Sequence, residues 1–488
     1  MIIEKASIDS LAFSFNATSK NLVLYEYRLN MKFKNKRVLV IGAGVSGLSS
    51  VKFFVERGAK VTVYDDNRMP RYETTLDNGA VYEFEIDNLL EEDFDLAILS
   101  PGVSINHVLA KRFATKLTND MTIGLSGRHK RVVAVTGTNG KTSVVNLIND
   151  AINSQKGLFK RKSVLCGNSG TPVTSVVREL RRKDAVVEVS SFMLETSVMS
   201  REIRQMHRLK FRPNIAVILN VTQDHLERHG TIENYIAHKA EITAHQKKRD
   251  VLILNYDDEV VRQMAFQTKA RVLYFSRTAR VHGVYVEGDD IFINLGGKAK
   301  ARKIGNLGKL GLVATHDIMN FLAMSLVVKL LGCGDNVISA PKKIDDHRIQ
   351  YIETVGNVAF YNDSKATNVS ACLAAVGTFE LPICLLVGGQ PKSQEFKSLF
   401  EKLPSNVVRV FAFGEAREQM ESNASEVGFE RLDCFETMEE AFREAVMHSG
   451  DTRIILLSPA CASFDQFRGY ADRGNVFKNL VKEHAERS

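Results

Sequence analysis

The sequence predicts an α/β protein of three domains, each built around a mostly parallel β-sheet. Short apolar runs alternate with segments of helical spacing from about residue 33 to the end of the chain, a pattern typical of parallel strands joined by helices. Two of the apolar runs lead into glycine-containing turns, at residues 42–47 and 137–140. A length of 488 residues also agrees with about three domains.

The first domain is predicted to span residues 31–125 and to have a Rossmann-like fold. The segment "RVLVIGAGVSG" predicts a strand, a tight turn and the start of a helix, and the strands "KVTVYD" and "DLAILSPG" follow. The turn matches the dinucleotide fingerprint, and Asp65 or Asp66 lies near the distance expected of an acid that binds ribose. A nicotinamide-dependent dehydrogenase is therefore an alternative, although such an enzyme needs no second phosphate loop downstream. Met31 is a second plausible start.

The second domain, residues 126–337, is predicted to be a P-loop-type α/β domain with a small β appendage. "RVVAV" predicts a buried strand, and apolar residues after Lys141 fall at helical spacing to about Gly157. The turn between them aims backbone N–H groups and the positive helix end at an anion, Lys141 adds a charge, and the Thr142 hydroxyl could reach magnesium. Gly137 and Gly140 are closer together than the strict P-loop pattern requires, and ordinary turn chemistry is the alternative.

Further strands of this domain deliver polar residues to the edge where the phosphate loop lies. They are "DAVVEVSS", "NIAVILNVTQDH", "DVLILN" and "RVLYFS", followed by a hairpin around "VYVEGDDIFINL". Glu188 ends a buried strand, where a carboxylate is costly unless it meets a cation such as magnesium. The alternative is a Glu beside a helix that Ser190 caps. Asp224 and His225 follow the next strand at the same edge.

The third domain, residues 338–488, is predicted to be a second Rossmann-like domain. Its strands are "VAFYND", "ICLLVGG", "VRVFAFG" and "RIILLSP", and a helical pattern follows each of them. This again indicates a mostly parallel sheet.

The composition favours a cytoplasmic protein that binds anionic small molecules. No apolar run approaches the length of a membrane span, and the first thirty residues lack the apolar segment of a signal peptide. The six cysteines show no paired spacing, so neither disulfides nor a zinc site is predicted. The net charge of +8 suits anionic ligands, but no arginine-rich tract supports nucleic-acid binding.

Nine motifs occur in an order and spacing that resemble the Mur ligases, over residues 33 to 485. They are "GTNGKT", "EVSSFMLE", "NVTQDHLERHG", "YIAHKAEI", "HDIMN", "DDHR", "YNDSKATN", "VGGQPK" and "LLSPACASFDQFRGYADRG". The resemblance implies an ATP- and Mg²⁺-dependent amide ligase of peptidoglycan precursor synthesis, which adds D-glutamate to UDP-N-acetylmuramoyl-L-alanine through an acyl phosphate. It also implies small-molecule partners only and a monomer. A folylpolyglutamate synthase-like ligase, an L-glutamate-using variant and a nonenzymatic nucleotide-binding regulator are the alternatives.

The resemblance assigns site residues to each domain. The uridine substrate would lie near Ser46, Asp65, Asp66, Ser100, Pro101, Gly102, Asn168 and Ser190. ATP would lie on Gly137, Thr138, Asn139, Gly140, Lys141 and Thr142, with Asn320 at the adenine and with Arg348 and Asp363 at the domain junction. Glutamate would lie on Lys365, Thr367, Lys392, Ser463 and Tyr470. The catalytic set would be Lys141, Glu188, His225, Lys239 and Lys365.

The resemblance further implies two magnesium ions and a modified lysine. Thr142 and Glu188 would face one ion, and His225 and Lys239 the other. Spacing alone indicates a solvated helix lysine at position 239, whereas Mur ligases carry a carbamylated lysine there. Two residues depart from the family: Met193 stands where Gln is usual, and Asp317 where Asn is frequent. Met193 cannot donate the hydrogen bond of a Gln.

Overall fold

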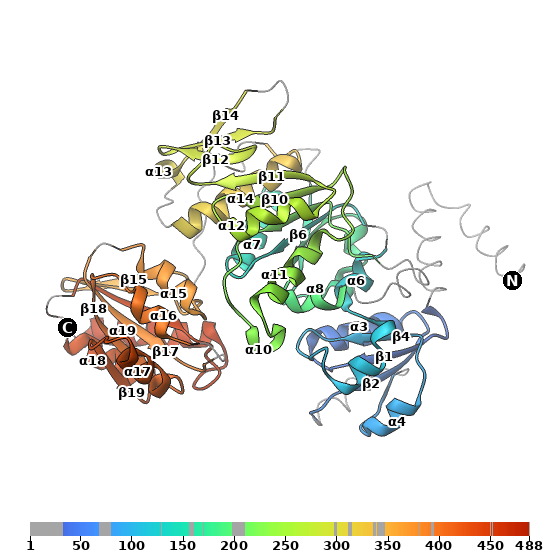
Figure 1. Cartoon of the computed structure of the whole chain (residues 1–488), viewed down its shortest axis with the longest axis horizontal. Helices are drawn as coiled ribbons and strands as arrows, with labels where there is room; N and C mark the ends of the chain where they lie inside the picture. The colour runs from blue at the N-terminus through green and yellow to red at the C-terminus, as the bar shows by residue number, and fades with distance from the viewer. Residues whose placement is uncertain are drawn as a thin grey trace, which may run out of the picture.

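Three separate sheets organise the chain, as the computed structural model shows (Figure 1). The structure describes residues 33–67, 80–127, 129–155, 161–168, 170–197, 210–296, 300–310, 315–334, 338, 347–379, 381–391, 395–448, 450 and 452–487. The predicted three-domain α/β class is confirmed. The domain limits stay a prediction, and Met31 and Lys392 lie outside the described residues.

The first sheet is entirely parallel, in the order β3-β2-β1-β4-β5. Its strands are β1 (Arg37–Ile41), β2 (Lys60–Tyr64), β3 (Ala80–Tyr82), β4 (Leu96–Leu99) and β5 (Leu117–Thr118), and its helices are α3 (Val45–Val55), α4 (Ile86–Glu91), α5 (Val108–Arg112) and α6 (Asp120–Leu125). Val38 and Val40 pack on one face, and Leu39 and Ile41 on the other. The strand order reverses between β1 and β4, and a crevice for ligands opens at such a point.

The central sheet has nine strands in the order β14-β13-β12-β11-β10-β9-β6-β8-β7. They are β6 (Val132–Thr136), β7 (Ser163–Gly167), β8 (Asp184–Glu188), β9 (Ile215–Ile218), β10 (Val251–Asn255), β11 (Arg271–Ser276), β12 (Gly283–Glu287), β13 (Asp290–Asn294) and β14 (Arg302–Asn306). Pairing is parallel from β7 to β12 and antiparallel from β12 to β14. The predicted β appendage is therefore the edge of this sheet.

Helices cover both faces of the central sheet. They are α7 (Lys141–Asn153), α8 (Ser191–Ser197), α10 (Leu226–His229), α11 (Ile232–Ala240), α12 (Glu259–Gln263), α13 (Leu307–Leu310) and α14 (Thr315–Leu330). One face packs against α7 and α14, which contact each other. The opposite face packs against α8, α11 and α12. Burial on both faces explains why the strands in the middle of this sheet are almost wholly apolar.

The C-terminal sheet has the order β15-β16-β20-β17-β18-β19, and only β15 is antiparallel to its neighbour. The strands are β15 (Gln350–Val355), β16 (Val358–Asn362), β17 (Ile383–Gly388), β18 (Val407–Phe413), β19 (Leu432–Phe435) and β20 (Ile454–Ala460), and the helices are α15 (Val369–Val376), α16 (Lys397–Lys402), α17 (Arg417–Glu426), α18 (Met438–Met447) and α19 (Tyr470–Arg487). Because β20 lies between β16 and β17, the loops after these three strands meet at one edge.

The strands that the apolar runs did not predict are the edge strands of the three sheets. They are β3, β5, β7, β14, β15 and β19. Most residues of β15 and β19 are partly or fully exposed, so these strands lack the continuous apolar run of a strand buried on both faces.

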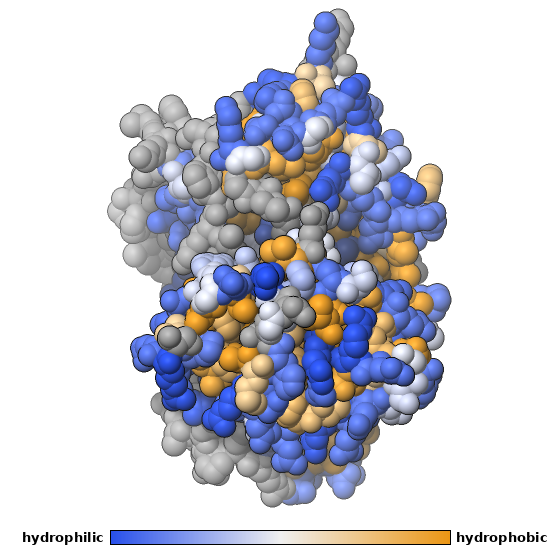
Figure 2. Space-filling model, turned by 90° about the vertical axis from the view of Figure 1, so that its left-hand side faces the viewer, coloured by the Kyte–Doolittle hydropathy of each residue, from blue (hydrophilic) through white to orange (hydrophobic). Residues whose placement is uncertain are grey.

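The surface mixes polar and apolar residues. Figure 2 shows hydrophilic and hydrophobic residues interspersed over the side to which the C-terminal domain contributes. Single exposed apolar side chains are normal on a globular protein. In the described part of the chain, no helix combines the length and the apolar character that crossing a bilayer requires.

Candidate active site

The predicted phosphate loop joins β6 to α7 and is fixed by contacts with the segment that follows β9. The backbone N–H of Thr138 donates to Asn220 O (3.0 Å), and that of Asn139 donates to Asn220 Oδ1 (2.8 Å). Gly140 caps α7 with φ of 83°, and a Cβ there would lie 2.6 Å from Asn320 Oδ1. Glycine is therefore required by both backbone conformation and space.

Lys141 lies across this loop at the positive end of α7. Its Nζ donates to the carbonyl oxygens of Gly137 (2.8 Å) and Thr138 (2.7 Å). The ammonium group is thus held where the loop amides and the helix N-terminus already favour an anion. Thr142 follows it as the second residue of α7.

Glu188 ends β8, next to β6, and its carboxylate is only half satisfied. The residue is 2% exposed, and Val135 of β6 is its register partner. Oε1 accepts a hydrogen bond from Asn168 Nδ2 (3.0 Å), whereas Oε2 has no partner among the described residues. A buried carboxylate oxygen without a donor is costly, and a hard cation would satisfy it. This orphaned oxygen beside the phosphate loop fits a magnesium ion.

Ser190 supports the structural alternative for its own position. Its Oγ accepts from Met193 N (3.3 Å) and so caps α8, and it is not among the residues that line the cavity between the first and central domains, described below.

His225 stands at the start of α10, on the loop that follows β9. Its φ is 55°, in the left-handed region. Its Nδ1 lies 3.2 Å from Glu227 Oε1, and its ring packs edge-on against Phe192, with 4.9 Å between centroids. The side chain is 30% exposed, so part of the ring remains accessible.

Lys239 is buried, and the expectation of a solvated helix lysine is wrong. The residue is 1% exposed, and its Nζ lies 4.3 Å from the centroid of the Tyr235 ring. Burial lowers the pKa of Lys239 well below its usual range; the charge of Lys141 lowers it further, and Asp224 opposes the shift. The tertiary structure therefore favours the neutral amine, which is the nucleophilic form.

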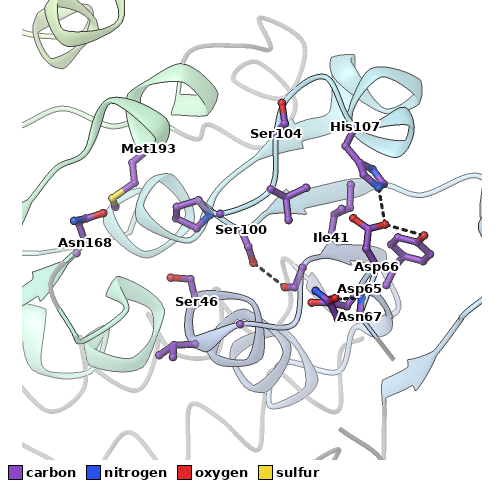
Figure 3. Close-up of a pocket in the computed structure, with 18 residues that line it drawn as sticks. Ile41, Ser46, Asp65, Asp66, Asn67, Ser100, Ser104, His107, Asn168 and Met193 are labelled. Atoms are coloured by element: carbon purple, nitrogen blue, oxygen red, sulfur yellow. Dashed lines mark hydrogen bonds and ion pairs between the residues drawn. The ribbon is translucent and has the colours of Figure 1, made fainter. Parts of the chain in front are cut away.

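A cavity of about 570 Å³ lies between the first and central domains (Figure 3). Asn168 and Met193 approach it from the central domain, opposite Asp66 and His107. The cavity brings together seven of the eight residues predicted for the uridine substrate: Ser46, Asp65, Asp66, Ser100, Pro101, Gly102 and Asn168. Met193, the departure from the family, is also in its wall.

Two of the predicted residues shape this cavity through the backbone. Asp65 accepts hydrogen bonds from the N–H groups of Ala43 (2.6 Å) and Asn67 (2.8 Å). Ser100 Oγ donates to Gly42 O (2.7 Å). These contacts fix the turn between β1 and α3, and Gly42 and Gly44 of this turn line the cavity together with Ser46.

The predicted adenine and junction residues line two cavities between the central and C-terminal domains. Asn320 and Arg348 line one of about 420 Å³, and Arg348, Asp363 and Lys365 line one of about 210 Å³. Arg348 Nη1 donates to Ser143 Oγ on α7 (3.0 Å), across the domain boundary. The junction therefore begins directly beside the phosphate loop.

Asp363 is held inside the C-terminal domain. It accepts from Ser458 Oγ (2.8 Å) and Ile349 N (3.1 Å), and burial raises its pKa to about 7. Both carboxylate oxygens have protein donors, so the side chain orders the junction as well as lining it.

The predicted glutamate residues lie on the loops after β16 and β20 and at the start of α19. Lys365 and Thr367 follow β16, Ser463 follows β20, and Tyr470 begins α19. Ser463 is 2% exposed, whereas Tyr470 is 39% exposed. The Tyr470 carbonyl accepts from Ser364 Oγ (2.8 Å), which links the first loop to the helix.

Arg473 joins these loops and was not predicted. It is fully buried and donates to Ser364 Oγ (3.0 Å), Ser364 O (2.9 Å), Cys461 O (3.1 Å), Ala462 O (3.1 Å) and Gly388 O (3.3 Å). Burial lowers its pKa to about 10, so the guanidinium stays charged at neutral pH. Its spacing of four and eight residues from the buried Phe477 and Val481 could have revealed it, because it places an arginine on the apolar face of α19.

Arg228 was also not predicted, and it ties the first domain to the central one. It contacts Glu195 Oε2 through Nε (3.0 Å) and Nη2 (2.7 Å), and its Nη1 donates to Pro101 O (2.9 Å). The "SPG" turn at the cavity between the two domains is thereby anchored to α10, which begins directly after His225.

Comparisons with known proteins cover all three domains. The family models described as "Mur ligase MurD-like, N-terminal domain", "Mur ligase middle domain" and "Mur ligase, glutamate ligase domain" match residues 36–118, 135–328 and 347–461. The MurF ligase from Thermotoga maritima, solved in complex with ADP, has a TM-score of 0.54 at 15% identity over 94% of this chain and 97% of that one. This likeness shows the fold.

Relatives at higher identity carry one name. The chain is 35% identical over 470 residues to the UDP-N-acetylmuramoylalanine–D-glutamate ligase of Koribacter versatilis (strain Ellin345), and 33% identical over 471 residues to that of Thermoanaerobacter sp. (strain X514). Each alignment covers 93% of this chain and 99% of the relative. The chain belongs to the Mur ligase family.

Proposed function

We propose that this protein is an ATP-dependent ligase that joins D-glutamate to UDP-N-acetylmuramoyl-L-alanine, in the synthesis of peptidoglycan precursors. The observation that carries the proposal is the near full-length identity of 33–35% to ligases of that name. The match of residues 36–118 to the MurD-like N-terminal domain favours this substrate over that of a folylpolyglutamate synthase-like ligase.

The uridine substrate occupies the cavity between the first and central domains. Ser46 and Asn168 offer donors to its phosphates, and Asp65 and Asp66 line the wall near the uracil and ribose. Asn168 also holds Glu188 Oε1. Its amide thus connects the end of this cavity to the phosphate loop, where the alanyl carboxylate has to meet ATP.

ATP lies on the phosphate loop, with its adenine toward Asn320 and Arg348. Lys141 exchanges its two carbonyl contacts for the phosphate oxygens, which places a full charge on the transferring group. Thr142, Glu188, His225 and carbamylated Lys239 would hold magnesium. When bound, Mg²⁺ neutralises phosphate charge and so assists phosphoryl transfer.

Carbamylation of Lys239 follows from the burial of its amine. The neutral nitrogen attacks carbon dioxide, an N–C bond forms, and one proton leaves to solvent. The product is an anionic carbamate, whose oxygens are the ligands that magnesium prefers. The charge change also removes the repulsion between Lys239 and Lys141.

The reaction has two chemical steps. In the first, the alanyl carboxylate attacks the γ-phosphate of ATP, and the bond to the β-phosphate oxygen breaks, which gives an acyl phosphate and ADP. In the second, the glutamate amine attacks the acyl carbon and loses a proton. The tetrahedral intermediate then expels inorganic phosphate and leaves the amide.

The C-terminal domain supplies glutamate to the second step. The two carboxylates of glutamate are best bound by cations and hydroxyls. The C-terminal domain provides these groups through Lys365, Thr367, Lys392, Ser463 and Tyr470. The acyl phosphate is sensitive to water, so the domains close around it. The hydrogen bond from Arg348 to Ser143 supports this closure, because it already joins the C-terminal domain to the helix that follows the phosphate loop.

None of the six cysteines forms a disulfide in the described part of the chain, which agrees with the reducing cytoplasm, where ATP is available. We place the reaction there and propose a monomer that acts on small molecules, without a nucleic-acid or membrane partner.

The decisive experiment is a ligation assay with D- and L-glutamate. We expect phosphate release only when the uridine substrate, ATP and D-glutamate are all present, together with the corresponding amide product. Equal turnover of L-glutamate would contradict the D-specific assignment. ATP hydrolysis at the same rate with and without both co-substrates would contradict the proposed ligase activity. The absence of ATP hydrolysis under every condition would contradict it as well.

A further inference from the structure

Three buried or half-buried side chains form a cluster that the ligation reaction does not use. They are Glu195 of α8, His229 at the end of α10, and His238 of α11. One potential ligand atom from each lies within 4.8 Å of the other two. The His229 side chain is fully buried, Glu195 is 2% exposed, and His229 Nδ1 lies 4.0 Å from Glu195 Oε1. Helix α11 contacts both α8 and α10 (Figure 1).

The His229 ring presents an unused nitrogen to this cluster. Its Nε2 lies 3.0 Å from Ser191 Oγ, whereas its buried Nδ1 has no hydrogen-bond partner among the described residues. Burial, together with nearby positive groups, lowers the pKa of His229 to about 4. In the tautomer that donates its Nε2 proton to Ser191 Oγ, Nδ1 carries a lone pair. Metal-binding histidines have this arrangement, in which a second group fixes one nitrogen and the metal takes the other.

The remaining two groups complete a mixed donor set. Glu195 Oε2 accepts two hydrogen bonds from Arg228, whereas Oε1 lies toward His229. The ring centroids of His238 and His229 are 5.1 Å apart. Two imidazoles and one carboxylate suit zinc and similar transition metals, whereas magnesium prefers oxygen ligands.

The geometry requires a small contraction. Zinc bonds of about 2.0–2.1 Å in a tetrahedral site separate the ligand atoms by about 3.3–3.4 Å. The 4.0 Å between His229 Nδ1 and Glu195 Oε1 can shorten by rotation of the carboxylate. The guanidinium of Arg228 next to the carboxylate reduces the affinity for a cation without blocking Oε1.

We infer that Glu195, His229 and His238 bind a divalent transition metal of the zinc class, at a site separate from the magnesium edge. A water molecule completes the coordination. The bound ion links α8, α10 and α11, and thus fixes both ends of the segment between His225 and Lys239. This inference does not depend on the proposed ligase activity.

The test is zinc binding by the metal-free, full-length protein in millimolar Mg²⁺, measured by equilibrium dialysis. We expect one zinc per chain and a higher thermal unfolding temperature with zinc, because the ion binds the folded state. His238→Ala removes a partly exposed ligand and should weaken zinc binding about tenfold or more. His282→Ala, which removes an exposed histidine before β12, is the matched control and should bind like wild type.

Two further variants keep the inference falsifiable. His225→Ala should still bind zinc, because we assign His225 to the magnesium site and not to the zinc site. His229→Gln takes the place of His238→Ala if the latter does not fold. X-ray absorption should show imidazole ligands whose number falls by one in His238→Ala. Wild-type zinc affinity in His238→Ala or in its substitute, or loss of zinc in His225→Ala alone, would overturn the inference.

Discussion

Replacing Arg473 with lysine should both destabilise the C-terminal domain and weaken glutamate binding. The buried guanidinium makes five hydrogen bonds, and an ammonium has only three donors, so at least two bonds are lost. Hydrogen bonds from a charged donor contribute about 1.5–3 kcal/mol each. The expected loss is therefore about 3–6 kcal/mol. At about 2–4 °C per kcal/mol for domains of this size, unfolding should occur at least about 6 °C lower.

The effect on glutamate follows from what Arg473 connects. Ser364 directly precedes Lys365, and Ala462 directly precedes Ser463, so the arginine sets the distance between the two loops that carry the residues we assign to glutamate. We expect the apparent KM for glutamate to rise several-fold, while the KM for ATP stays near its wild-type value.

Calorimetry and steady-state kinetics on the same preparations would measure both effects. Arg468→Lys, at an exposed arginine five residues earlier, is the matched control and should change neither quantity. A wild-type unfolding temperature together with a wild-type glutamate KM in Arg473→Lys would refute the reasoning. Equal increases in both KM values would show that Arg473 acts on the whole protein rather than on the glutamate loops.

Three further predictions concern the residues assigned to ATP, glutamate and magnesium. Lys141→Ala should abolish acyl-phosphate formation with the fold intact, because a charge partner of the transition state is lost; turnover within about tenfold of wild type would contradict the assignment. Thr367→Ala or Ser463→Ala should raise the KM for glutamate far more than the KM for ATP. Equal increases in the two KM values would show that glutamate is the wrong ligand for these residues. Lys239→Arg should be as inactive as Lys239→Ala, since a guanidinium cannot form a carbamate; a ¹³C carbamate signal should appear with labelled bicarbonate in wild type only, and near-normal turnover of Lys239→Arg would remove the carbamate from the mechanism.

The sequence by itself determined the fold class and which polar residues follow the carboxyl ends of the buried strands. Runs such as "VVAV" and "ICLLVG" have no polar residue that could face solvent, so they belong to strands buried on both faces. A polar residue at the end of such a run necessarily lies at the carboxyl edge of a parallel sheet. For this reason Lys141, Glu188 and His225 could be placed near one another from the sequence. The exposed edge strands β15 and β19 lack this signal.

The tertiary structure decided what depends on contacts between distant segments. Spacing within a helix cannot distinguish a solvated lysine from one that a second helix covers, and so the burial of Lys239 was not predicted. The same limit applies to Arg473, whose partners come from three loops, and to the cavity wall in which Asn168 of one domain faces Asp66 of another. Periodicity reports which face of an element is apolar, because burial repeats along the chain. It carries no record of which groups meet across that face, since hydrogen bonds and charges pair through space.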